Sequence, residues 1–480
     1  MNKIKIILIS ALLLMLSTSG ALAKSPSLVE AKILELSEAK WTEMSTRYPI
    51  PALPDGVSKA PSAVILASWW NSLGDNTLTE LIMMSLESNN DLASARAKIK
   101  EARASLGINK AAMLPWLDTT DYWSGNRSPL TTGGDKVDTY RLGLDASWEI
   151  DIFGGRRATV KAGVATLEAQ HAALHATWVS LSAEVAINYL SLRTLQERLD
   201  VAKSNLALQE DSLNMLSSRY KAGLVDGLAY SQSKSIYEQT KATIPPIETS
   251  IEGVKNNLAV LTGVIPGALE EKLKDKQPIP KGDTVELVGI PANALRQRPD
   301  IYVAERQLIA QLSRTKSARA DLWPKFFLVG SIGTEALDTG SLFSGPAKAY
   351  SFGPKITWPI FHWGAIKNNI RVQGAREEQY LAAYEKTILT AVGEVRNALT
   401  SEVRERQRNA SLKLGLDAAR DALSVANDKY NSGLTDYNNV IIAQKAYLTL
   451  SEQYAISQGE LTSNIVRLFK ALGGGWEPME

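Results

Sequence analysis

The chain of 480 residues contains no cysteine, and this absence removes several functional classes. Without thiols there is no disulfide framework, no cysteine nucleophile and no acceptor for a lipid on a processed N-terminus. An excess of one charge is lacking too, because 53 Lys and Arg residues stand against 51 Asp and Glu residues. A nucleic-acid partner calls for a basic stripe or patch, so none is expected.

The sequence also lacks any apolar run of about 20 residues, the length that a transmembrane helix needs. A shorter apolar run at 6–16 follows Lys3 and Lys5 and precedes the small-residue stretch Ala21-Leu22-Ala23. This pattern predicts a signal peptide over residues 1–23. The mature protein is therefore expected to be exported and to carry no helical membrane anchor.

Signals of catalysis are missing. We find no phosphate-binding glycine loop, no nucleophile elbow and no acid–base carboxylate pair in a supporting context. Of the three histidines, His171 and His175 are spaced to share one helix face, but no third ligand motif lies nearby. We read them as surface or intersubunit residues, and we expect no enzyme activity, no cofactor and no resident metal.

What the sequence does contain is two segments, 140–150 and 350–360, in which apolar and polar residues alternate over about 10 positions. This length and period match one pass of a transmembrane β-barrel strand. Aromatic residues near the strand ends, expected at the membrane interface, are Tyr140, Trp148, Tyr350 and Trp358. Polar residues expected to face a wet lumen are Arg141, Asp145, Glu149 and Lys355.

The chain is duplicated. Matching residues lie about 210 positions apart, namely Trp148 and Trp358, Gly154 and Gly364, Tyr220 and Tyr430, Gly223 and Gly433, Asp226 and Asp436, and Gly263 and Gly473. The first repeat spans 69–263, with a helix at about 71–112, a β-hairpin at 114–150 and a long helical hairpin at 156–262. The second spans 293–472, with a helix at about 293–320, a β-hairpin at 323–360 and a helical hairpin at 365–472. Segments 24–68, 264–292 and 473–480 lie outside the repeats, and we expect the first to be periplasmic or equatorial and the second an equatorial linker.

Residues 156–222 and 365–432 contain no proline. An unbroken helix of this length spans on the order of 100 Å at 1.5 Å per residue. Such helices need lateral partners along their whole length, and leucines at spacings of three, four and seven residues supply an apolar stripe. The predicted fold is mainly α-helical, with four transmembrane strands per chain and long helical hairpins.

Four strands cannot close a barrel, and a bilayer tolerates β-structure only in closed form. Two copies of the chain give about eight strands and a filled interior, whereas three give about twelve and leave room for a passage. Because the inward positions are charged or hydroxylated, we prefer a trimer with a shared twelve-stranded barrel.

At this point the sequence resembles a known family, the TolC/OprM-type outer-membrane factors, in particular the NodT/OprM-like branch. The residues that carry the resemblance are Trp69-Trp70, the strand exit Trp148-Glu149-Ile150-Asp151-Ile152-Phe153-Gly154, the turns at Tyr220–Gly223 and Tyr430–Gly433, Arg298-Pro299-Asp300, and Ala471–Trp476. The resemblance covers essentially the whole mature chain. It implies a homotrimeric barrel in the lipid of the Gram-negative outer membrane, continued by a periplasmic α-helical tunnel.

The resemblance further implies a passive exit duct that is opened by a periplasmic adaptor protein and an inner-membrane pump, with the RND type favoured. The cargo would be drugs or other small molecules. A channel for type I protein secretion is an alternative with the same architecture. A trimeric autotransporter-like surface protein is disfavoured because its four strands would be contiguous at one end of the chain. A periplasmic helical protein without membrane contact is a third alternative, which extraction by salt rather than detergent would reveal.

Family members close the periplasmic end of the channel with acidic side chains and links between helices. The residues here that the resemblance nominates for this gate are Asp436, Tyr430, Asp226 and Asn439. The match departs from the family at Thr435, Asn439 and Ile442, so other pairs must form the lock, and Tyr430 with Asp226 is one candidate. An N-cap role is the alternative explanation for both aspartates.

The same turns are expected to receive the adaptor. Candidate contact residues are Gly223, Leu224, Val225, Gly433, Leu434 and Tyr437. Glycine at the end of a helix also serves simply to reverse the chain, and the other residues could equally be solvated turn positions.

Overall fold

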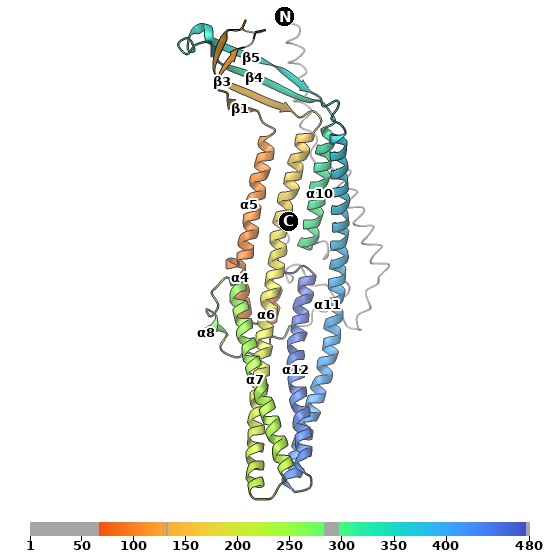
Figure 1. Ribbon diagram of the computed structural model, residues 1–480. Helices are drawn as coiled ribbons and strands as arrows, with labels where there is room; N and C mark the ends of the chain where they lie inside the picture. Colours follow the sequence, from red (N-terminus) through yellow and green to blue (C-terminus); the bar gives the residue numbers. More distant parts are fainter. Residues whose placement is uncertain (1–66, 128, 131–132, 283–296, 477–480) are drawn as a thin grey trace, which may run out of the picture. The chain divides into compact units, whose positions relative to one another are not determined.

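The computed structural model describes residues 67–127, 129–130, 133–282 and 297–476 (Figure 1). The predicted signal peptide lies outside these residues, as do 24–66, 283–296 and 477–480. Within the described part, no helix is both long enough and apolar enough to cross a membrane.

The first repeat runs through a short 3-10 helix and a series of helices and strands. In order these are η1 (Trp69–Leu73), α4 (Asn76–Ser88), α5 (Asn90–Ala111), β1 (Trp116–Thr119), β2 (Tyr122–Arg127), β3 (Lys136–Ile150), α6 (Gly155–Lys221) and α7 (Gly227–Leu261). The short helix α8 (Glu270–Leu273) follows. The second repeat contains α10 (Pro299–Ala320), β4 (Lys325–Ala336), η2 (Gly345–Ala347), β5 (Lys348–Thr357), α11 (Ala365–Asn431) and α12 (Tyr437–Ala471).

The two longest helices, α6 and α11, each have 67 residues, which corresponds to about 100 Å of helix. A glycine in the left-handed region precedes each helix, Gly154 with φ 76° and Gly364 with φ 79°. The lateral partners that such long helices require are present, because α5, α7, α10 and α12 all pack along α6, and α10 and α12 pack along α11 (Figure 1). The predicted mainly helical fold class is confirmed.

The helix expected at about 71–112 is broken into three pieces. Asn89 has an extended backbone, with φ −67° and ψ 134°, and its side-chain oxygen accepts hydrogen bonds from the backbone N–H groups of Asp91 and Leu92. It therefore acts as the N-cap of α5. Its side-chain amide also donates to the carbonyl of Leu261 at 2.9 Å, so the break ties α5 to the end of α7.

The strands form one antiparallel sheet in which β3 pairs with β4, and β4 pairs with β5. The first half of the first β-hairpin differs from the single strand that was expected. It consists of β1 and β2, both paired with β3 and separated at Thr120 and Asp121. Asp121 uses its side chain to accept the Gly143 N–H at 3.2 Å, which replaces a ladder bond at the interruption. The sheet is thus four strands wide, with β1 and β2 sharing one edge and β5 forming the other.

The register separates the predicted polar and apolar positions onto opposite faces of the sheet. Asp145 pairs with Ser331, and Ser331 pairs with Ser351, whose hydroxyl lies 2.9 Å from that of Ser331. Arg141, Glu149 and Lys355 share this face by the same register. The other face carries apolar residues from all of the strands, and many of them are strongly exposed in the single chain: Leu117, Trp123, Ile332, Tyr350, Phe352 and Ile356.

The main core lies where α4, α6 and α12 meet, among fully buried side chains such as Trp69, Leu78, Tyr189 and Phe469. Trp69 stacks on Phe469 with ring centroids 5.5 Å apart. In the second repeat Arg298 holds the position that corresponds to Asn89, and it binds the end of α12 as Asn89 binds the end of α7. Its guanidinium donates to the Ala471 carbonyl at 2.7 Å and forms ion pairs with Asp300 and Glu394.

Candidate functional sites: the helix turns and the strand-to-helix junction

The turns that end α6 and α11 have the same geometry. Gly223 and Gly433 both have φ 71°, a conformation that costs a residue with a side chain roughly 1–2 kcal/mol. The N–H of Gly223 donates to the Tyr220 carbonyl at 2.9 Å, and that of Gly433 to the Tyr430 carbonyl at 3.0 Å. Space around both glycines is open, so the glycines are required for chain reversal rather than for close approach.

A small hydrophobic core links the two turns. Its buried members come from α6, α7, α11 and α12: Leu216, Ile236, Tyr430, Tyr437, Val440 and Ile441. The rings of Tyr430 and Tyr437 meet edge to face with centroids 5.0 Å apart. The ends of the two helical hairpins are therefore held side by side by packing (Figure 1).

Tyr430 takes a partner that the sequence reasoning did not find. Its hydroxyl accepts a hydrogen bond from Arg219 Nη1 at 2.9 Å, and the same guanidinium lies 5.0 Å from the centre of the ring. This contact joins α6 of the first repeat to α11 of the second. Within one chain the suggested pair of Tyr430 with Asp226 is not formed, and the Asp226 carboxylate instead accepts the Ala229 N–H at 3.0 Å as the N-cap of α7.

The second aspartate behaves differently. Asp436 precedes α12 with the same backbone angles as Asp226, but its side chain makes no capping hydrogen bond and is exposed. Nearby, the Asn439 amide donates to the Thr435 hydroxyl at 2.6 Å. A carboxylate that is not used by its own helix is available for another group, whereas that of Asp226 is occupied.

Of the expected adaptor contacts, Leu224 and Leu434 are 74% and 77% exposed. Val225 is half-buried against the core between the turns. The expectation for Tyr437 is wrong, because only 4% of this residue is exposed and its ring belongs to that core. Tyr437 is the first residue of α12, and the first turn of this helix packs against the neighbouring helices.

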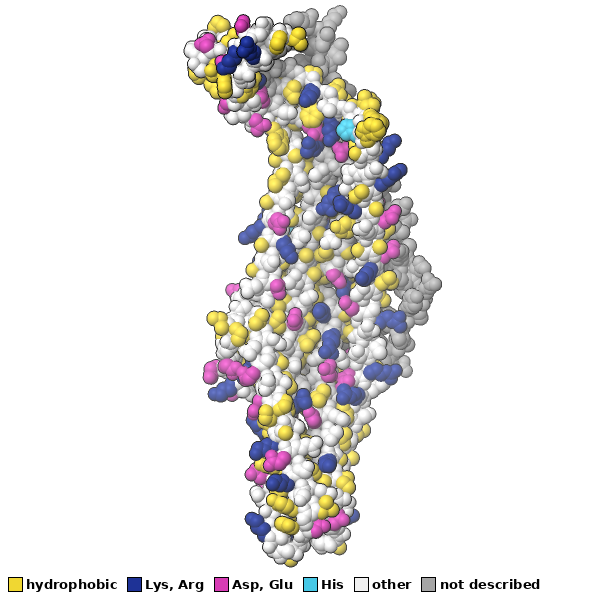
Figure 2. Space-filling view, viewed as in Figure 1, with side chains coloured by type: hydrophobic (Ala, Val, Ile, Leu, Met, Phe, Trp, Pro, Cys, Tyr) yellow, Lys and Arg dark blue, Asp and Glu magenta, His cyan; other side chains and the backbone are white. Residues whose placement is uncertain are grey.

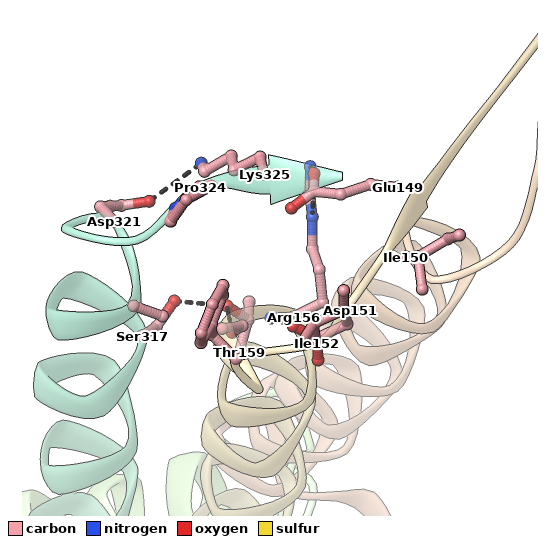
Figure 3. A pocket seen from close by; sticks show the side chains of 13 residues that line it. Glu149, Ile150, Asp151, Ile152, Arg156, Thr159, Ser317, Asp321, Pro324 and Lys325 are labelled. Carbon is pink, nitrogen blue, oxygen red and sulfur yellow. Dashed lines mark hydrogen bonds and ion pairs between the residues drawn. The ribbon is translucent and has the colours of Figure 1, made fainter. Parts of the chain in front are cut away.

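A second polar site lies where β3 passes into α6 (Figure 3). Arg156 binds the Glu149 carboxylate through Nε at 3.0 Å and Nη2 at 2.6 Å. Asp151 caps the helix, since its two oxygens accept the backbone N–H groups of Arg156 and Arg157. Arg156 and Arg157 are thus both bonded to acidic residues at the end of the first strand hairpin.

The segment leading into β4 completes this site. A pocket of about 180 Å³ lies between the end of β3, the start of α6 and the end of α10. The Thr159 and Ser317 hydroxyls lie 3.0 Å apart across it, and Lys325 pairs with Asp321 at 2.9 Å (Figure 3). Each of these charges has an opposite partner, so the junction is a neutral polar link between the two repeats.

The remaining residues predicted on the strands are placed as follows. Arg141 and Asp145 form an ion pair at 2.8 Å on the polar face. Lys355 and Tyr350 are exposed, and Tyr140 is half-buried. The indole N–H of Trp148 donates to the Met113 carbonyl at 2.9 Å, and that of Trp358 to the Leu322 carbonyl at 3.1 Å.

The histidine pair does not form a metal site in the described residues, where no group of three or more potential ligands gathers. His175 instead packs between Trp178 and Trp476, with ring centroids 5.0 and 4.8 Å away. Burial lowers the pKa of its imidazole below the ordinary value.

The chain thus consists of a sheet with one polar and one exposed apolar face, joined to two long helical hairpins. Comparison with known proteins agrees with it, since the family described as "Outer membrane efflux protein" matches residues 81–264 and 290–474. The chain belongs to this family. It is an outer-membrane efflux channel protein, and the predicted family, localisation and general function are confirmed.

Individual relatives of this efflux protein are similar over nearly their whole length. The outer membrane protein OprJ of Pseudomonas aeruginosa is 29% identical over 90% of this chain and 93% of its own. The toluene efflux pump outer membrane protein TtgF of Pseudomonas putida is 30% identical, over 85% of this chain and 86% of its own. Among solved structures, the outer-membrane channel OprN has a TM-score of 0.82 at 31% identity, covering 90% of this chain and 99% of that one.

Proposed function

We propose that three copies of this chain close one barrel and one helical tunnel, forming a passive exit duct for small molecules across the outer membrane. The observation that carries the proposal is the sheet itself. Its β1–β2 and β5 edges each pair on one side only in the described chain, and one face carries exposed apolar side chains. Unpaired N–H and C=O groups are not tolerated in hydrocarbon, so neighbouring copies must complete both edges.

Three copies of a sheet that is four strands wide give about twelve strands, enough to surround an aqueous passage. The face that carries Arg141, Asp145, Glu149 and Lys355 would line this passage, while Tyr140, Trp148, Tyr350 and Trp358 would meet lipid. The mass of the detergent-solubilised particle tests the assembly. A trimer is expected, and a monomer would refute the duct.

The turns of the helical hairpins are the proposed gate and adaptor site. Asp436 is proposed to face its copies near the tunnel axis, where three like charges would attract cations. Asp436→Ala is expected to change single-channel conductance. Equal conductance of variant and parent under all pH values would remove Asp436 from the gate.

Leu224 and Leu434 are proposed to contact a periplasmic adaptor, which links the channel to an inner-membrane pump. Leucines that are about three-quarters exposed at a chain reversal offer an apolar contact that the fold itself does not use. Leu434→Asp should abolish efflux in cells while leaving the particle mass unchanged. Leu414→Asp, at a similarly exposed position on α11, is the matched control and should retain efflux.

The proposed cargo is a range of drugs or other small molecules, supported by the naming of the relative TtgF as part of a toluene efflux pump. A deletion strain should become more susceptible to such compounds, and the intact gene should restore resistance. Unchanged susceptibility together with loss of a secreted protein would favour type I secretion instead.

A further inference from the structure

The duplication holds in atomic detail where the strands pass into the long helices. The indole of Trp148 donates to the Met113 carbonyl, and the indole of Trp358 donates to the Leu322 carbonyl, at 2.9 and 3.1 Å. Both the donors and the acceptors are related by the repeat offset of 210 and 209 residues. Each residue of one junction therefore has an identifiable equivalent in the other.

Within one chain, the segment that follows β3 is covered by the segment that leads from α10 into β4. Phe153, which follows β3, stacks on Trp323 with ring centroids 5.2 Å apart and an interplanar angle of 18°. The ring centroid of Phe326 lies 6.5 Å from that of Phe153. These three rings form an apolar contact between the end of one repeat and the segment that leads from α10 into β4.

The equivalent residues of this contact are present but exposed. Trp363 corresponds to Phe153, and Leu114 and Leu117 correspond to Trp323 and Phe326. Their exposures are 89%, 63% and 68%. Figure 2 shows hydrophobic side chains gathered on the visible face beside the start of α11. Among the residues that the structure describes, Trp363 is therefore not covered as Phe153 is by Trp323, and Leu114 and Leu117 are not covered as Trp323 and Phe326 are.

The same asymmetry continues along the helices. Ala165 of α6 is 3% exposed, whereas its equivalent on α11, Ala375, is exposed. Ala162 is 4% exposed, whereas its equivalent Val372 is 48% exposed. The face of α11 below Trp363 is therefore uncovered at positions that are buried on α6.

We propose that Trp363 of one copy packs against Leu114 and Leu117 of a second copy, repeating between chains the contact that Phe153 makes within one. This inference rests on the proposed three-copy assembly. It specifies how adjacent copies meet where the strands pass into the helices. The contact is continuous with the pairing of β5 with the β1–β2 edge of the next copy. Repeated three times, it closes the ring.

The chemistry of the uncovered junction suits a second copy of the chain. The junction inside the chain contains the Glu149–Arg156 ion pair, whose equivalent positions hold Pro359 and Ile366. The Asp321–Lys325 pair likewise corresponds to Ala112 and Trp116. An apolar contact between chains requires no desolvation of charge, and its surfaces become available once each chain has folded.

The absence of native cysteine makes a direct test possible. A Trp363→Cys, Leu114→Cys variant, treated with a short bismaleimide in the membrane, should give covalent dimers and trimers on a denaturing gel. The matched control is Phe153→Cys, Trp323→Cys, which should link within one chain and migrate as a monomer. A Trp363→Cys, Leu130→Cys variant controls for random collision, because Leu130 is 96% exposed in the loop between β2 and β3.

The outcomes separate this inference from the proposed function. A particle with the mass of a trimer that gives no linked species from Trp363→Cys, Leu114→Cys overturns the inference and leaves the duct intact. Equal linking of Trp363→Cys to Leu130→Cys and to Leu114→Cys also overturns it. A monomeric particle defeats both proposals. In addition, Trp363→Ala should lower the temperature at which the trimer dissociates, whereas Phe343→Ala, at an 81% exposed position in the second hairpin loop, should not.

Discussion

Removal of one hydroxyl group, by Tyr430→Phe, should weaken the closed state of the proposed gate. The hydroxyl accepts a hydrogen bond from Arg219 Nη1 at 2.9 Å, and Tyr430 as a whole is only 8% exposed. Phenylalanine keeps the ring, and with it the edge-to-face contact with Tyr437 and the cation–π contact with Arg219. The substitution therefore isolates the hydrogen bond.

The magnitude follows from the partners. A hydrogen bond to a charged donor contributes about 1.5–3 kcal/mol, and the half-exposed guanidinium of Arg219 places this bond near about 1–2 kcal/mol. Three copies in a trimer give about 3–6 kcal/mol if the bond breaks on opening. Because about 1.4 kcal/mol is a factor of ten, the ratio of closed to open channels should fall by roughly 10²–10⁴.

Single-channel recordings in planar bilayers measure this effect as open time and conductance. Tyr230→Phe is the control, since it removes a hydroxyl close to the same turn while retaining the stacking of that ring on Tyr220. Longer or larger openings are expected for Tyr430→Phe only. If Tyr430→Phe and the parent gate identically while both remain trimeric, the Arg219–Tyr430 bond does not hold the channel closed.

Two further predictions concern stability. A Cβ at Gly263, which has φ 74°, would collide with the carbonyl of Ser88, so Gly263→Ala should cost more than about 2 kcal/mol, whereas Gly223→Ala, with open space, should cost about 1 kcal/mol. Thermal unfolding compares the two, and equal losses would contradict the steric argument. For His175, burial lowers the pKa in the folded protein, so the unfolded chain binds the proton more readily and stability should fall as the pH drops below about 6.5. His175→Gln should reduce this dependence and His362→Gln should retain it; the reverse pattern would exclude His175 as its source.

Much of the architecture could be predicted from local patterns. The absence of proline over 156–222 and 365–432 predicted the two long helices, and the alternation at 140–150 and 350–360 predicted strands with one polar and one apolar face. These features depend on backbone periodicity, which each segment carries in its own residues. The 210-residue repeat then predicted that both halves share one plan.

Only the tertiary structure decided which side chains meet. Arg219 and Tyr430 are 211 positions apart, and their contact depends on α6 and α11 lying side by side. Tyr437 reads as a turn residue in the sequence but is buried, because four helices converge on its ring. The break at Asn89 arises from a cap that also binds the end of α7. Sequence periodicity determines which face of an element is apolar, whereas the packing of distant elements determines what that face contacts.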